Sequence, residues 1–152
     1  MKRFLAIAMA ICSALSISTY SADINITNSS SLAFGSFAAG SGGTVTVSPA
    51  GVCSASGDVI SVILNCAAAE FTITGDPNTT YFIDLPADNF ATLSGPGSDM
   101  IITHFTSNPA GADGQLSAGG TQNLSVGGTL SVGNNQAAGS YSGSFTVIVD
   151  YN

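Results

Sequence analysis

Few residues of this chain can do acid–base or nucleophilic chemistry. Of its 152 residues, nine are Asp or Glu, two are Lys or Arg, and one is histidine. That histidine, His104, lies in the alternating run MIITHF, where it shares a predicted strand face with Met100 and Ile102. A catalytic imidazole needs a serine and a carboxylate placed around it, and no motif of the chain supplies them. We therefore expect no catalytic residue, no cofactor and no enzymatic activity.

Glycine-rich stretches do not change this expectation. GSYSG at 139–143 resembles a nucleophile turn, but Tyr141 stands where the serine must be and no helix pattern follows. The runs 40–43 and 127–133 lack the lysine and the following helix of a phosphate-binding loop. The sequence thus predicts no nucleotide site.

The acidic residues favour a solvated surface over a metal site. Asp84 and Asp88 flank LPA, and Asp76 lies in the turn-like GDPN, but none of these matches a calcium-loop motif. Calcium binding in one of these loops stays open as a minor alternative. A lone histidine and two cysteines are too few for a structural zinc site, so we predict no metal.

The first 22 residues, MKRFLAIAMAICSALSISTYSA, have the organisation of a secretory signal peptide. Two basic residues precede an apolar run that is too short to span a membrane, and small polar residues follow. We predict a signal peptide over residues 1–22 and a single domain over residues 23–152.

Two cleavage positions fit this segment. Cleavage after Ser21 leaves Thr19 at the third position before the cut, whereas cleavage after Ala22 leaves the bulkier Tyr20 there. Both remain candidates.

Removal of the signal peptide leaves a chain without lysine or arginine that keeps all nine carboxylates. Such a surface offers no cation to phosphate or to anionic lipid, which argues against nucleic-acid binding and membrane insertion. Cys53 and Cys66 are then the remaining cysteines, and in an exported chain they are expected to form one disulfide.

Strand signals dominate the rest of the sequence. Val, Ile, Thr, Phe and Tyr alternate with small polar residues, and Gly, Pro, Asn, Asp and Ser interrupt the runs, whereas helix-favouring clusters are short. This pattern predicts an all-β antiparallel β-sandwich. The expected strands cover residues 23–27, 32–37, 43–48, 58–64, 70–74, 79–85, 99–106, 122–132 and 140–151, with a weaker candidate at 87–94.

The segment NLSVGGTLSVG at 123–133 allows two interpretations. Gly127 and Gly128 could form the turn of a short hairpin. Leu124, Val126 and Leu130, however, share one parity, which favours a single long strand with a bend or bulge at the glycines.

The chain ends in an unusually apolar strand pattern, GSYSGSFTVIVDYN. Alternation places one set of large side chains on the same face. These residues are Tyr141, Phe145, Val147, Val149 and Tyr151. We expect this face to be covered by the domain core, and one backbone edge of the strand to be available to another chain.

Several motifs are similar to the bacterial secreted family known as domain of unknown function 4402. They are FG near the start, GTVTVSP, EFTITG with a following LP, VGGTL and the closing YSGSFTVIVDY. The resemblance covers residues 23–152 and implies an exported, immunoglobulin-like β-sandwich related to pilin or fimbrial subunits.

The C-terminal strand also resembles that of chaperone–usher pilin subunits. Gly139 is the fourteenth residue from the end and Tyr151 is the penultimate one, with apolar residues of matching parity between them. This resemblance implies donor-strand exchange, in which an N-terminal strand of one subunit completes the next. The candidate donor residues are Ile24, Ile26, Leu32 and Phe34.

We therefore expect an exported structural or adhesive surface protein, secreted through the periplasm, that assembles with like subunits through strand pairing and is assisted by a periplasmic chaperone. The alternative is a self-contained secreted module that binds a carbohydrate or a surface protein. Its support is the group of aromatic residues near Tyr81, Phe82 and Phe90.

Overall fold

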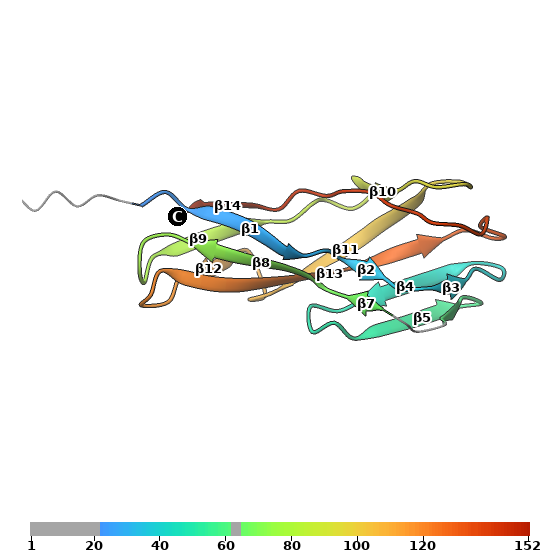
Figure 1. Ribbon diagram of the computed structural model, residues 1–152, viewed down its shortest axis with the longest axis horizontal. Coiled ribbons are helices and arrows are strands. Elements are labelled where there is room, and N and C mark those ends of the chain that lie inside the picture. Colours follow the sequence, from blue (N-terminus) through green and yellow to red (C-terminus); the bar gives the residue numbers. More distant parts are fainter. Residues whose placement is uncertain (1–21, 62–64) are drawn as a thin grey trace, which may run out of the picture.

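The computed structural model describes residues 22–61 and 65–152 (Figure 1). Within these ranges all regular secondary structure is β-strand, and all strand pairs are antiparallel. The predicted all-β class is confirmed. Residues 1–21 of the predicted signal peptide, and residues 62–64 of the strand expected at 58–64, lie outside the described residues.

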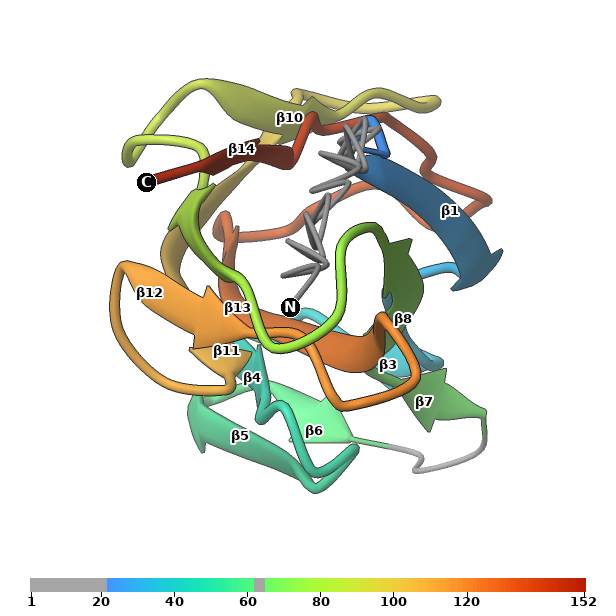
Figure 2. The same cartoon turned by 90° about the vertical axis from the view of Figure 1, so that its left-hand side faces the viewer.

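The largest sheet has seven strands. They are β1 (Asn25–Ser30), β4 (Gly43–Val47), β5 (Cys53–Gly57), β8 (Ala69–Thr74), β10 (Ala91–Leu93), β11 (Met100–Asn108) and β13 (Thr121–Val132). The main path runs β1-β8-β13-β11-β10, and β4 joins β13 to β5. Figure 2 shows this sheet curling around the interior of the molecule.

Three smaller sheets complete the fold. Their strands are β2 (Ala33–Phe34), β3 (Phe37–Ala38), β6 (Ile60–Ser61), β7 (Cys66–Ala67), β9 (Thr80–Asp84), β12 (Asp113–Gln115) and β14 (Ile148–Tyr151). One sheet has the order β12-β9-β14, and the pairs β2-β7 and β3-β6 form the other two. The strand expected at 32–37 is therefore two short strands, interrupted near Gly35, whose φ of 72° ends the extended conformation.

The long strand β13 organises the large sheet. Residues 121–126 pair with β8 and residues 128–132 pair with β4, while β11 occupies the opposite edge. The prediction of one continuous strand in place of a hairpin is confirmed. The register shift lies in the partner strand, between Thr103 and Thr106 of β11, and the glycines of β13 mark the change of partner from β8 to β4.

The interior consists of two apolar clusters. One gathers side chains from β2, β4, β10, β11 and β13, and the other gathers side chains from β8, β9, β13 and the C-terminal segment. Leu32, Phe105 and Phe145 are partly buried and pack against both clusters. Through Phe145 the C-terminal segment therefore packs against both core clusters.

The C-terminal strand is shorter than expected. The sequence predicts a strand over 140–151, but the structure has β14 over Ile148–Tyr151 and one isolated bridge between Ser94 and Ser142. The alternation itself is confirmed, because Val147 is buried and Tyr141, Phe145, Val149 and Tyr151 are half-buried while the residues between them are exposed.

Candidate strand-binding groove

A groove of about 270 Å³ lies between the N-terminal strands and the C-terminal segment. Figures 1 and 2 show that segment running beside β1. The N-terminal side of the groove includes Asn28, Ser31 and Leu32, and the C-terminal side includes Gly143, Ser144 and Phe145. Phe71, Leu93 and Ile102 also line it, so much of its surface is apolar.

On each side of the groove lies a backbone edge without a described strand partner. β1 pairs with β8 and with no other described strand. On the facing side, no backbone hydrogen bond joins residues 143–147 to another described residue. Unpaired N–H and C=O groups along an apolar groove form a template onto which an extended chain can pair.

Phe145 forms the aromatic part of the groove. Its ring meets that of Phe105 at a centroid distance of 5.1 Å and that of Phe71 edge-on at 6.4 Å. These contacts hold residues 143–147 in position although they have no ladder partner, since paired aromatic rings add stability beyond their buried area. Phe145 remains half-buried and faces the groove.

The other predicted assembly residues fix the ends of the C-terminal segment. The Tyr141 hydroxyl donates to the carbonyl oxygen of Ala137 at 2.9 Å and accepts from the Gly97 amide at 2.9 Å. Gly139 lies before these contacts in a loop, with a φ of 148° that favours glycine, and an added Cβ would overlap Pro96. Val149 and Tyr151 belong to β14, which pairs with β9.

The candidate donor residues pack within their own chain. Ile26 of β1 lies opposite Ile73 of β8, and Phe34 of β2 lies opposite Cys66 of β7. Ile24 packs against the second core cluster, and Leu32 lines the groove. Their role as a donor strand stays a prediction.

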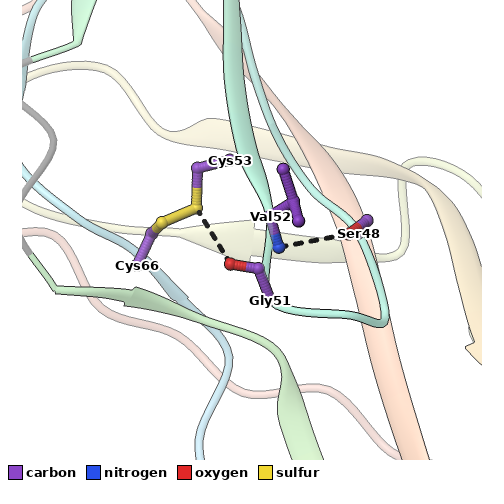
Figure 3. The surroundings of a disulfide bond; sticks show 5 residues. All are labelled: Ser48, Gly51, Val52, Cys53 and Cys66. Atoms are coloured by element: carbon purple, nitrogen blue, oxygen red, sulfur yellow. Dashed lines mark hydrogen bonds between the residues drawn. A yellow bond between two sulfur atoms is a disulfide. The ribbon is translucent and has the colours of Figure 1, made fainter.

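The predicted disulfide between Cys53 and Cys66 is confirmed (Figure 3). It joins β5 to β7 with a Cα–Cα distance of 6.5 Å, within the usual range for disulfides. Next to it, the Val52 amide donates to Ser48 Oγ at 3.2 Å, which closes the turn between β4 and β5 (Figure 3). The disulfide therefore connects the outer strand of the large sheet to the β2-β7 pair beside the groove.

His104 has the parity of Met100 and Ile102 but does not lie on their face. Met100 and Ile102 are buried, but His104 is exposed with a φ of 50° at the irregular pairing of β11. Its backbone N–H donates to Asp88 Oδ1 at 2.6 Å, and its Nδ1 lies 3.0 Å from Thr103 Oγ1. The extra residue of the bulge reverses the alternation, which sequence parity does not reveal.

Two further properties concern the described part of the chain. No group of three or more His, Cys, Asp or Glu side chains there is arranged to hold a metal ion. No helix in the same ranges has the length and apolar character needed to cross a membrane.

Tyr81, Phe82 and Phe90, which support the alternative of a secreted binding module, lie in different environments. Tyr81 is fully buried, with its hydroxyl donating to Gln122 Oε1 at 2.9 Å, so its ring belongs to the core. Phe82 is 38% exposed and Phe90 is 84% exposed. Of the three, Phe90 presents the largest fraction of its surface to solvent.

Burial raises the pKa of the Tyr81 hydroxyl above its ordinary value of about 10. The unfolded chain then loses this proton at a lower pH than the folded chain does. The stability that the neutral hydroxyl contributes is complete below about pH 10 and is lost as the pH rises through the folded-state pKa. We expect the wild type to have a free energy of unfolding in urea about 1 kcal/mol higher than that of Tyr81→Phe at neutral pH. This difference should become smaller above about pH 10. A constant difference up to strongly alkaline pH would contradict this.

The fold and the groove define an antiparallel all-β protein with unpaired strand edges at its N- and C-terminal segments. Residues 24–151 match the family model described as a domain of unknown function (DUF4402), and the chain belongs to that family. No curated protein and no solved structure matches the chain. The resemblance predicted from the sequence motifs is thereby confirmed at the level of this family.

Proposed function

We propose that this protein is an exported, pilin-like subunit with an immunoglobulin-like β-sandwich fold, which assembles on the cell surface through strand pairing in the groove. The observation that carries the proposal is the apolar groove with unpaired backbone on both sides, β1 and residues 143–147. The disulfide supports export, since such bonds persist in oxidising compartments.

The occupant that we propose is the N-terminal segment of a second copy. In that segment Ile24, Ile26, Leu32 and Phe34 share one parity, the polar residues Asn28 and Ser30 interrupt this apolar face, and Asp23 is the one carboxylate. Asp23 is one of nine carboxylates in the chain, so this segment brings little negative charge to another acidic copy. β1 is also held by a single described strand, so its release from its own copy breaks one ladder and widens the groove, and the segment of the second copy then pairs with β8 in its place.

A bulky side chain in the groove should block assembly. Ser144 is exposed and lines the groove, so Ser144→Trp would place its ring in the groove without replacing a buried side chain. We expect the association constant to fall about tenfold, or by about 1.4 kcal/mol, as measured by concentration-dependent size-exclusion chromatography, with fewer assemblies in electron microscopy.

The matched control is Ser54→Trp, which places the same side chain at an exposed position of β5 that does not line the groove. It should assemble like the wild type. If the wild type stays monomeric at every concentration tested, or if both variants assemble equally, the groove is not the assembly site.

A further inference from the structure

The first described residue, Ala22, is held by side chains from two distant parts of the chain. Its backbone N–H donates to Asp76 Oδ1 at 2.8 Å, and its carbonyl oxygen accepts from the Tyr151 hydroxyl at 2.9 Å. The Tyr151 oxygen in turn accepts from the Asp76 backbone N–H at 2.7 Å. Both polar backbone groups of one exposed residue are thus bound by a connected pair of partners.

The neighbouring backbone is shaped to hold this arrangement. Gly75 directly follows the last residue of β8, and a Cβ at this position would overlap the Tyr151 hydroxyl. The Gly75 amide donates to the Gly120 carbonyl oxygen at 2.9 Å, which fixes the turn that carries Asp76. Tyr151 is fixed from the other side, because β14 pairs it with Tyr81 of β9. Ala22 is therefore bound by two residues, Asp76 and Tyr151, whose own backbones are held by hydrogen bonds to other parts of the fold.

We infer that the export signal peptidase hydrolyses the Ser21–Ala22 bond, and that the α-ammonium group so released binds the Asp76 carboxylate. Water is the second reactant: the Ser21 carbonyl carbon gains its oxygen and leaves as a carboxylate, and the Ala22 nitrogen becomes an ammonium group. The amide donor seen at 2.8 Å from Asp76 Oδ1 then becomes a charged donor at the same position. Charge-assisted hydrogen bonds are stronger than those between neutral groups.

The site distinguishes the two cleavage positions that the sequence leaves open. Cleavage after Ala22 would remove both groups that Asp76 and Tyr151 bind, and Asp23 would become the first residue. Cleavage after Ser21 keeps both hydrogen bonds and places a positive charge against a carboxylate. The ammonium site uses none of the residues that line the groove. If the N-terminal segment is exchanged, the same contacts form with Asp76 and Tyr151 of the receiving copy, so the assembly and the ammonium site are tested by separate measurements.

The first test is the identity of the N-terminal residue in the exported protein. The full-length chain is expressed with its own export signal, and the mature protein is examined by intact-mass spectrometry and N-terminal sequencing. We expect Ala22 as the first residue. A chain beginning at Asp23, or at any other residue, overturns the inference.

The second test measures the ion pair itself. The mature chain contains no lysine, so its α-amino group is its one primary amine and an acetylating reagent selective for amines reports on it alone. We expect Asp76→Asn to be acetylated about threefold faster than wild type, the change expected when loss of a carboxylate lowers an amine pKa by about 0.5. Tyr151→Phe tests the second contact and should also accelerate labelling.

The control for this experiment is Asp99→Asn, which removes the same charge from an exposed loop position. It should be labelled at the wild-type rate, with circular dichroism confirming that each variant is folded. Equal labelling rates in wild type, Asp76→Asn and Asp99→Asn would show that the ammonium group is not bound by Asp76, and would overturn the inference even if the cut falls after Ser21.

Discussion

Gly127→Ala is expected to lower the free energy of unfolding by about 3 kcal/mol. An added Cβ at this position of β13 would lie 2.7 Å from the Ser48 carbonyl carbon and 2.9 Å from the Pro49 nitrogen, and closer still to the Val47 carbonyl oxygen. All three are backbone atoms at the end of β4 or in the two residues after it, so no side-chain rotation can relieve the overlap. β4 would have to move away from the strand that joins both core clusters.

The matched control for this variant is Gly119→Ala. The nearest atom to a Cβ there is Ser117 Oγ at 3.7 Å, an ordinary contact. Because alanine restricts the unfolded chain more than glycine does, this variant should be neutral or slightly stabilised. Urea denaturation followed by circular dichroism measures both variants, and equal midpoints would contradict the backbone overlap at Gly127.

Sequence patterns predicted the strands that have one buried and one exposed face. In β9 the residues Tyr81 and Ile83 are buried while Phe82 and Asp84 are exposed, which is the alternation that the sequence displays. β13 was predictable for the same reason, since its apolar residues keep one parity through the glycines. A side-chain period of two is visible wherever one face of a strand is buried.

Strands without that contrast were not predictable. β5 has the sequence CSASG, and all of its residues after Cys53 are exposed, so no alternation marks it as a strand. Its pairing with β4 depends on backbone hydrogen bonds and on the disulfide at its start. Conversely, residues 143–147 have the alternation but no ladder partner among the described residues, because alternation reflects burial of side chains and not pairing of the backbone.

The sequence predicted only part of the candidate site: it singled out Leu32, Phe34 and Phe145 of the groove but not Phe71, Leu93 or Ile102. The apolar face of the C-terminal segment, including Phe145, follows from the sequence, whereas its position beside β1 depends on how the large sheet curls. The contacts of Ala22 with Asp76 and Tyr151 left no signal in the sequence at all, since they join residues 54 and 129 positions apart. Long-range polar contacts of this kind require the tertiary structure.

Removal of the disulfide is expected to cost about 3 kcal/mol of stability, the value that the chain-entropy account gives for a closed loop of this size. Cys53 and Cys66 are separated by 13 positions, and both are partly buried against the first core cluster. In the double variant Cys53→Ser, Cys66→Ser the polar hydroxyls also meet this apolar surface. Cys53→Ala, Cys66→Ala separates the two effects, because it removes the bond without adding a polar group.

We expect thermal unfolding of the double-alanine variant to match that of the wild type under reducing conditions, and both to unfold well below the oxidised wild type. The stability loss should be concentrated at β5 and β7, which the disulfide joins, so amide hydrogen exchange should accelerate there more than in β13. Uniform acceleration across the large sheet would mean that the bond stabilises the whole fold and not its edge. Unchanged unfolding after reduction would show that the strand pairs of β5 and β7 are sufficient without it.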